Sequence, residues 1–170
     1  EDGIRDRSPS RGLGDVYKRQ HNKVINCCDA ILAKYPDDVD ALVTKGIALN
    51  KTGEHGDAIE IYKIVLKKDP NNVDALMNIA VTLKFLKKLD EAIKYYDKIQ
   101  ILDPSIKRAS IEKYEVFIEL GSTDDAFLAA QGITTDEAKE IKTQAKENDY
   151  SVQHAYSLRR FYKLQKTNSQ

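Results

Sequence analysis

The side chains that could do catalytic or metal chemistry are few and scattered along the sequence. His21, His55 and His154 stand without the cysteines or acidic residues that a metal site needs at short spacing. Cys27 and Cys28 are adjacent, and because a disulfide between neighbours would strain the peptide joining them, we expect free thiols and a reducing compartment. No glycine-rich phosphate loop is present. The sequence therefore predicts no catalytic residues, no metal site, no cofactor and no small-molecule substrate.

The composition fits a single helix-rich domain. The 170 residues are 41% hydrophobic, which is enough for a core, with 8 glycines and 4 prolines. Lysine plus arginine and aspartate plus glutamate both number 27, so the formal net charge of +0 gives no overall attraction to nucleic acid or anionic membrane. No apolar run approaches the roughly 18 residues of a membrane helix, and we expect a cytoplasmic protein.

The most informative pattern is a repeat of 34 residues. Three of the four prolines, Pro36, Pro70 and Pro104, follow one another at this step. Other columns that keep the step are Ala41, Ala75 and Ala109; Leu49, Leu83 and Phe117; Ala58, Ala92 and Ala126; Gly53 and Gly121; and Tyr62 and Tyr96. A fixed step of this length indicates stacked supersecondary units, each of which covers the apolar face of its neighbour.

Within one period the spacing predicts two helices. Leu42, Gly46 and Leu49 lie on one face of a helix from about 39 to 51, and the small Gly46 lets a second helix approach closely. That second helix, from about 55 to 68, follows a turn near Gly53 and ends before Pro70, because proline cannot continue a helix.

These segments resemble tetratricopeptide repeats. The family pattern places large apolar residues, a small residue, an alanine, an aromatic residue and a proline at fixed positions. Here it is carried by Leu42, Gly46, Leu49, Ala58, Tyr62 and Pro70, and again by Leu76, Ala80, Leu83, Ala92, Tyr96 and Pro104. Lys45 departs from the family's leucine, which indicates a slot near the surface. The resemblance implies an all-α solenoid of antiparallel helix hairpins with an atypical C-terminal helical cap.

The pattern fades toward both ends. The first 20 residues, EDGIRDRSPSRGLGDVYKRQ, have no apolar stripe and resemble translated sequencing-adapter material, so we expect the native N-terminus to be missing, which leaves a lost signal or membrane segment open. After Gly121 the repeat decays, and Thr135 is expected to cap a helix over about 136–147, before a last helix over about 150–166. The expected order is a non-native or disordered extension at 1–20, the second helix of a truncated repeat at 21–36, repeats at 37–70 and 71–104, a degenerate repeat at 105–133, capping helices at 134–166 and a polar tail at 167–170.

The resemblance implies a concave groove lined by the first helix of each repeat. The groove residues expected are Val43, Ile47, Asn50, Met77, Asn78, Val81, Phe85, Arg108, Ile111 and Glu115. Most of them are apolar, and a contiguous exposed apolar strip indicates a partner site. The predicted function is a non-catalytic scaffold that binds a protein or peptide, with hydrogen bonds from Asn50 and Asn78.

Several alternatives stay open. Some groove residues could pack against neighbouring helices, the C-terminal helix could fill the groove, or the chain could be a structural spacer in a longer protein. The family variant that grips a terminal carboxylate is not expected, because Val43 and Ile47 stand where it has lysine and asparagine. Nucleic-acid binding is disfavoured, and the residues that could contact RNA or DNA are Arg159, Arg160, Phe161, Tyr162, Lys163 and Lys166.

Overall fold

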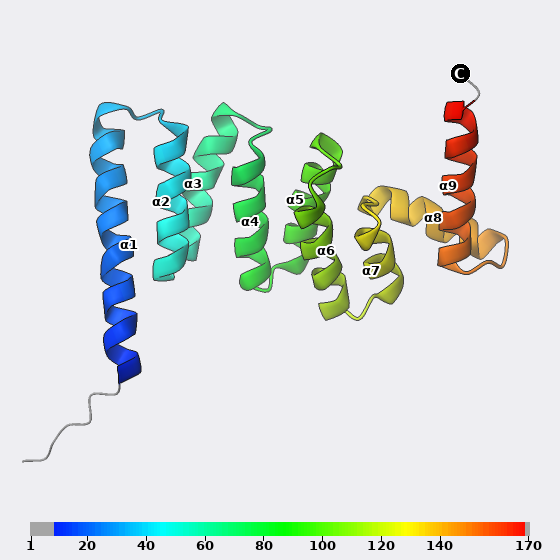
Figure 1. The fold of residues 1–170 in the computed structure, drawn as a ribbon, viewed down its shortest axis with the longest axis horizontal. Coiled ribbons are helices and arrows are strands. Elements are labelled where there is room, and N and C mark those ends of the chain that lie inside the picture. The colour runs from blue at the N-terminus through cyan, green and yellow to red at the C-terminus, as the bar shows by residue number, and fades with distance from the viewer. Residues whose placement is uncertain (1–8, 169–170) are drawn as a thin grey trace, which may run out of the picture. The chain divides into compact units, whose positions relative to one another are not determined.

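The structure, a computed structural model, describes the backbone of residues 9–168 and the side chains of residues 14–167. Every regular element in these residues is an α-helix (Figure 1), which confirms the predicted all-α class. The helices are α1 (Pro9–Lys34), α2 (Val39–Thr52), α3 (His55–Lys68), α4 (Val73–Phe85), α5 (Leu89–Leu102), α6 (Lys107–Glu119), α7 (Thr123–Ala130), α8 (Thr135–Glu147) and α9 (Val152–Asn168).

The chain divides into two compact units, Glu1–Thr82 and Leu83–Gln170, and the division falls inside α4. In the first unit α2 packs against α1 and α3. In the second unit α6 packs against α5 and α7, and α8 packs against α7 and α9. Because short turns join α2 to α3 and α6 to α7, these pairs form antiparallel hairpins (Figure 1).

The hairpin of α2 and α3 is closed by a tight contact between Gly46 and Tyr62. A Cβ atom added to Gly46 would lie 2.4 Å from Cε1 of Tyr62, far inside the ordinary packing distance of carbon atoms. Tyr62 and its neighbour Ala58 are fully buried. This confirms the prediction that a small residue at position 46 admits the second helix.

Three turns at the 34-residue step share one backbone conformation. Gly53, Lys87 and Gly121 all have positive φ, at 93°, 61° and 72°. In the first turn the Gly53 amide donates to the Asn50 carbonyl, and the Glu54 amide donates to the Leu49 carbonyl at 2.9 Å. The same two bonds recur in the other turns and satisfy carbonyl groups at the end of the preceding helix, as in a Schellman motif.

Prolines and caps separate one hairpin from the next. α1, α3 and α5 each end two residues before a proline of the 34-residue column, as the sequence predicts. After the first two prolines, an N-cap side chain starts the following helix. Oδ1 of Asp38 accepts from the Ala41 amide at 2.8 Å, and Oδ1 of Asn72 accepts from the Ala75 amide at 3.0 Å.

The structure differs from the sequence analysis near the N-terminus. α1 begins at Pro9, not at residue 21, and its first part continues beyond the end of α2 (Figure 1). Residues 14–20 are all exposed, and local bonds support them, such as that from Nε of Arg19 to the Asp15 carbonyl at 3.3 Å. A search for an apolar stripe misses a helical segment such as 14–20, which is exposed all round. Residues 1–8 of the expected extension and 169–170 of the expected tail lie outside the described residues.

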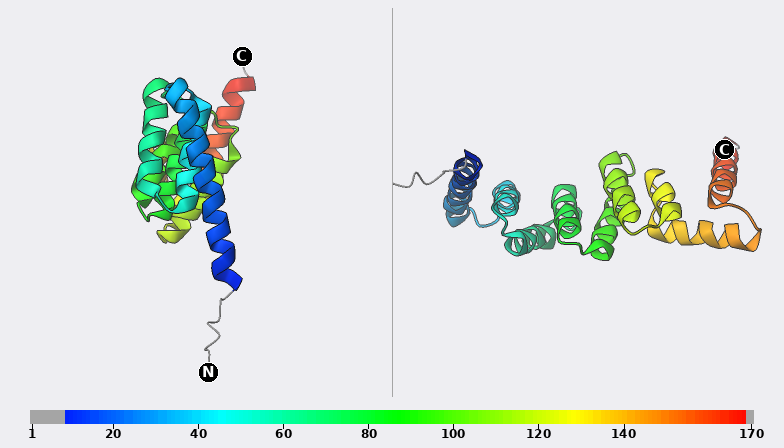
Figure 2. Two further views of the ribbon diagram at one scale, coloured as in Figure 1. Left: turned by 90° about the vertical axis from the view of Figure 1, so that its left-hand side faces the viewer. Right: turned by 90° about the horizontal axis from the view of Figure 1, so that it is seen from below.

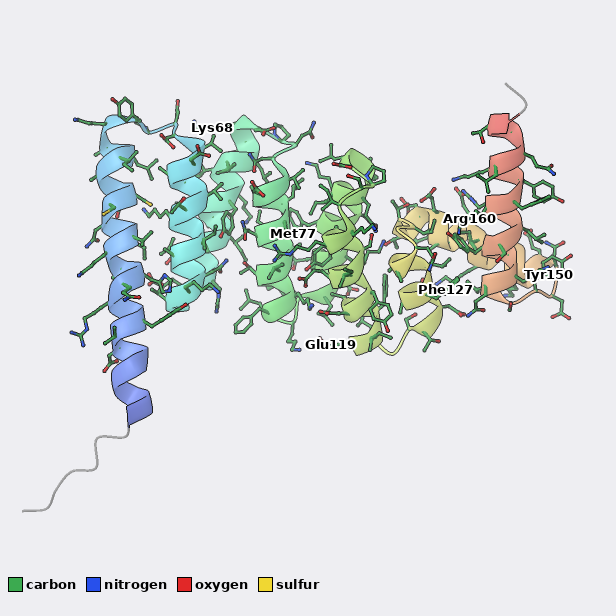
Figure 3. All side chains as sticks on the ribbon, viewed as in Figure 1. Lys68, Met77, Glu119, Phe127, Tyr150 and Arg160 are labelled. Atoms are coloured by element: carbon green, nitrogen blue, oxygen red, sulfur yellow. The ribbon has the colours of Figure 1, made fainter. Side chains whose placement is uncertain are left out.

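The second unit ends in a small helical core. The buried residues of this core are Leu128, Ala138, Ile141, Ala145 and Ala155. α8 lies crosswise to α7 and α9 (Figure 2). The rings of Phe127 on α7, which is labelled in Figure 3, and Tyr156 on α9 meet edge to face, with centroids 5.7 Å apart. These contacts join the last helices to the final hairpin.

The N-cap of α8 is Thr134, so the prediction of Thr135 is wrong by one residue. Oγ1 of Thr134 accepts from the Glu137 amide, and the Glu137 carboxylate accepts from the Thr134 amide at 3.2 Å. This reciprocal capping box requires a glutamate three residues after the cap. Glu137 stands at that distance from Thr134 and not from Thr135.

Candidate functional site

An apolar stripe on α6 stays uncovered in the second unit. Ile111, Tyr114 and Ile118 are exposed by 57%, 41% and 49%. Their spacing of three and four residues places them on one face of the helix, which we call the α6 stripe. α9 packs against α8 and α7, so within this unit the C-terminal helix leaves the α6 stripe open. Exposed large apolar side chains that adjoin one another are typical of a partner surface.

Ion pairs border the α6 stripe. Nζ of Lys84, near the end of α4, lies 2.9 Å from Oε2 of Glu112 and also binds Glu115, while Lys87 lies 2.7 Å from Glu119. Burial acts to lower the pKa of Lys84, but Glu115 and Glu112 outweigh burial and hold the pKa above its ordinary value. The carboxylates of α6 are therefore fixed against the end of α4.

The groove residues predicted in the second unit divide by role. Phe85 is 69% exposed and, with Ile111, adds apolar surface. Nε of Arg108 lies 3.8 Å from Glu112, and Glu115 binds Lys84, so these polar side chains are engaged in ion pairs. The apolar members rather than the charged ones are available to a partner.

The groove residues predicted in the first unit also divide. Ile47 is exposed, Val43 and Val81 are half-buried, and Met77 is buried with 7% of its surface exposed. Met77, labelled in Figure 3, therefore packs inside the array and offers almost no surface. Val43 and Ile47 lie four residues apart on α2 and form a smaller apolar surface there.

Asn50 is held in a polar network. Its Nδ2 donates to Oγ1 of Thr82 at 2.7 Å and to the Tyr62 hydroxyl at 3.4 Å, and its Oδ1 lies 3.1 Å from Nδ1 of His55. Thr82 donates in turn to the carbonyl of Asn78, a half-buried residue, at 2.6 Å. Both N–H donors of the Asn50 amide are used, so the expected hydrogen bond from Asn50 to a ligand has no donor left.

A lysine–aspartate pair that the sequence analysis missed recurs between repeats. Lys113 of α6 binds Asp97 of α5 at 2.5 Å, and Lys45 of α2 binds Asp29 of α1 at 2.6 Å. The pairs are two repeat steps apart, since 113 − 45 and 97 − 29 are both 68, and Ile79 replaces the lysine between them. Lys45 keeps part of its side chain exposed, whereas Lys113 is 1% exposed. The sequence signal for these pairs is that Lys45 and Lys113 occupy the same position of the 34-residue repeat.

Lys113 is the centre of a buried polar cluster. Its Nζ also donates to Oε1 of Gln100 at 3.0 Å and to the Ile133 carbonyl at 2.8 Å, and Asp97 accepts from the Thr135 amide at 3.1 Å. Burial lowers the pKa of Lys113, and Asp97 opposes this shift without cancelling it. The cluster fixes the loop between α7 and α8 to α5 and α6, which is a structural role.

The described residues include no group of three or more histidine, cysteine or acidic side chains that could hold a metal ion. None of the helices in this part of the chain is both long and apolar enough to cross a membrane. Cys27 is exposed and Cys28 is buried, and both are free thiols. Burial raises the pKa of the Cys28 thiol, which makes the reactive thiolate scarcer at neutral pH.

The hairpins and their shared turns define a helical solenoid of the tetratricopeptide repeat (TPR) class. Residues 15–131, more than half of the chain, match the family model described as the N-terminal TPR repeats region of Psidin. The chain belongs to this family, which confirms the resemblance seen in the sequence. The match begins inside the stretch 1–20 that the sequence analysis set apart. A search of curated proteins found no match.

Solved structures of similar fold include several titled as MamA. "Crystal structure of MamA" has a TM-score of 0.63 and 20% identity, covering 78% of each chain. "MamA RS-1 ArsTM double mutant" has a TM-score of 0.61 and 18% identity, covering 93% of each chain. "MamA MSR-1 C2" has a TM-score of 0.57 and 18% identity, covering 78% of this chain and 75% of the other. At such identities the likeness shows the fold alone.

Proposed function

We propose that the chain is a non-catalytic scaffold that binds a segment of a partner protein on the first helices of its repeats. The observation that carries the proposal is the α6 stripe, in which three large apolar side chains share one exposed helix face. Burying such surface is worth about 25 cal/mol per Å². Tyr114 adds an aromatic side chain of the kind that often dominates binding energy. Phe85, in the same unit at the end of α4, adds a further exposed aromatic side chain.

The partner segment is one with apolar side chains along a single face, either extended or helical. Affinity near micromolar, about −8 kcal/mol, is expected because ordering a flexible ligand opposes the contacts. The free thiols of Cys27 and Cys28 support a reducing, cytoplasmic setting. A structural spacer is the second candidate, favoured by the burial of Met77 and the engaged amide of Asn50.

Selection from a displayed peptide library tests the scaffold proposal. An enriched peptide is expected to bind the double variant Ile111→Glu, Ile118→Glu at least about tenfold more weakly than the parent, because two carboxylates would face its apolar side chains. The matched control is Ile101→Glu, since Ile101 is 71% exposed on α5, a second helix of a repeat. Thermal melting verifies that each variant folds. Equal affinity in the double variant, or a library that enriches no sequence, would favour the spacer.

A further inference from the structure

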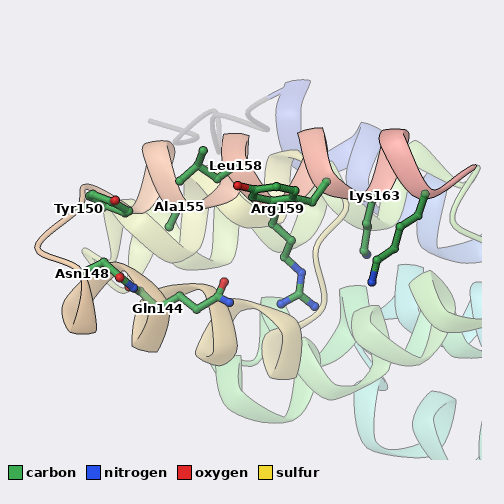
Figure 4. Close-up of a pocket in the computed structure, with 9 residues that line it drawn as sticks. Gln144, Asn148, Tyr150, Ala155, Leu158, Arg159 and Lys163 are labelled. Carbon is green, nitrogen blue, oxygen red and sulfur yellow. The ribbon is translucent and has the colours of Figure 1, made fainter. Parts of the chain in front are cut away.

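The cap holds an open cleft between α8 and α9 that lies apart from the α6 stripe. Its volume is about 470 Å³, within the range of natural ligand pockets. The lining residues are Gln144, Asn148, Tyr150, Ala155, Leu158, Arg159, Tyr162, Lys163 and Lys166. Figure 4 shows Gln144 and Asn148 on the α8 side and Arg159 and Lys163 extending from α9. The lining therefore contains three cations and no acidic side chain.

Burial falls steadily along the face of α9 that lines the cleft. Ala155 is buried in the core of the cap, Leu158 and Arg159 are half-buried, and Lys163 and Lys166 are exposed. On the α9 side the cleft is thus apolar at its inner end and cationic at its outer end, while Gln144 and Asn148 on the α8 side face the inner end with polar amides. Tyr150 closes part of the inner end, and its ring is held edge-on against His154 with centroids 4.7 Å apart.

The cations lie in one line because of their spacing. Arg159, Lys163 and Lys166 are four and three residues apart, so they share a helix face, and Arg159 and Lys163 are separated by about 6 Å along the axis. Alternate side chains of an extended peptide are about 6.6 Å apart and also share a face. Two carboxylates at alternate positions of such a peptide would match this pair of cations.

Two glutamates of α8 hold the cations without neutralising the cleft. Nη1 of Arg159 bonds to Oε2 of Glu140 at 2.8 Å, which leaves other guanidinium donors for a ligand. Lys163 lies 3.6 Å from Glu137, beyond direct hydrogen-bond distance. Among the described residues Lys166 has no acidic partner. Three cations against two carboxylates leave an excess of one positive charge at the cleft.

We propose that this cleft binds an acidic peptide segment of a partner protein, in which an apolar residue is followed at alternate positions by two acidic residues. The apolar side chain would enter beside Leu158 and Ala155, and the carboxylates would meet Arg159 and the lysines. The side-chain amide of Gln144, and the groups of the Asn148 amide beyond its bond to the Gln144 carbonyl at 2.9 Å, can pair with the peptide backbone. Nucleic acid fits less well, because it carries a charge on every phosphate, whereas the cleft has an excess of one positive charge and the formal net charge of the chain is +0.

The test measures fluorescence anisotropy of labelled probes with the full chain. The peptide Gly-Leu-Ser-Asp-Ser-Asp-Gly is expected to bind, and the same peptide with asparagine in place of both aspartates to bind about tenfold more weakly. The double variant Lys163→Ala, Lys166→Ala should weaken the acidic peptide by about tenfold. The matched control Lys146→Ala, Arg160→Ala removes the same charge from outside the cleft and should change affinity by less than about twofold.

Three other results of these measurements would overturn the proposal. Equal losses in the two double variants would mean that overall charge, not the cleft, attracts the peptide. Tighter binding of a labelled oligodeoxythymidine, abolished by the cleft variant, would assign the cleft to nucleic acid. No binding of the acidic peptide by a chain with a normal melting temperature would leave the cleft without this function. The α6 double variant should bind the acidic peptide normally, so failure here is separable from failure of the scaffold proposal.

Discussion

At the scale of single residues, Gly46 is the described glycine at which an added Cβ atom would make the shortest contact. Alanine favours a helix over glycine by about 1 kcal/mol, so propensity alone predicts that Gly46→Ala stabilises α2. The added Cβ would lie 2.4 Å from the ring of Tyr62, which is fully buried, so the ring would have to shift within the core. Overpacking of this kind costs about 1–3 kcal/mol or more and should outweigh the helix term.

We therefore expect Gly46→Ala to lower the free energy of unfolding by about 1–2 kcal/mol in urea denaturation. The matched control is Gly56→Ala in α3, where an added Cβ meets nothing within 4 Å. That variant should be neutral or more stable by up to about 1 kcal/mol. A Gly46→Ala variant as stable as the Gly56→Ala variant would show that the Tyr62 ring can move at little cost.

At the scale of elements, the turn between α4 and α5 carries a lysine where the equivalent turns have glycine. Lys87 adopts φ of 61°, a left-handed conformation that costs an L side chain about 1–2 kcal/mol. Lys87→Gly removes that cost and also removes the ion pair with Glu119, which is exposed and worth at most about 1 kcal/mol. Lys87→Ala removes the ion pair but keeps the strain.

The expected order of unfolding free energies follows from these two terms. Lys87→Gly should exceed Lys87→Ala by about 1 kcal/mol, since only glycine relieves the left-handed backbone. Urea denaturation of the pair isolates the backbone term, because both variants lack the Glu119 contact. Equal stability of the two variants would mean that the turn relaxes to a different conformation when Lys87 is replaced.

Helices inside the repeat could be predicted from the sequence, and so could α8 and α9 beyond it, but the packing of these last two helices could not. α2 and α3 were predicted within a residue or two because apolar spacing, Gly53 and Pro70 mark their faces and ends. The apolar pattern does not reveal the early part of α1, because residues 14–20 are all exposed and form no buried stripe. The α8–α9 cleft was missed because its lining depends on how two non-repeating helices pack. The groove residues were predicted from their position in the repeat. Met77 and Ile111 share one such position, which does not show that Met77 is buried and Ile111 is exposed.

At the scale of the whole molecule, polar contacts join the cap to the repeats beside a small apolar core. The family match ends at residue 131, before α8. Besides the Lys113 cluster, Nζ of Lys142 on α8 binds both carboxylate oxygens of Asp125 on α7 at 2.8 and 2.9 Å. Ser122 also donates to Asp125 at 2.6 Å. The stability of this end of the molecule should therefore depend on the charge of Asp125.

The sign of that dependence follows from the pKa of Asp125. Burial acts to raise this pKa, but the hydrogen bonds from Lys142 and Ser122 outweigh burial and hold it below its ordinary value of 3.8. A depressed carboxyl pKa contributes stability that is present above the ordinary value and is lost as the pH falls through the folded-state value. Asp125→Asn should remove this contribution at neutral pH, where the loss is about 1 kcal/mol.

Thermal melting of the full chain from about pH 6 to about pH 2 measures the effect. The parent and Asp125→Asn curves are expected to lie apart at the upper end and to converge below the folded-state pKa, because the protonated parent carboxyl no longer pairs with Lys142. The matched control is Asp124→Asn, an exposed neighbour in the first turn of α7, which should follow the parent at every pH. A gap that stays constant down to the lowest pH would show that Asp125 acts through packing and not through its charge.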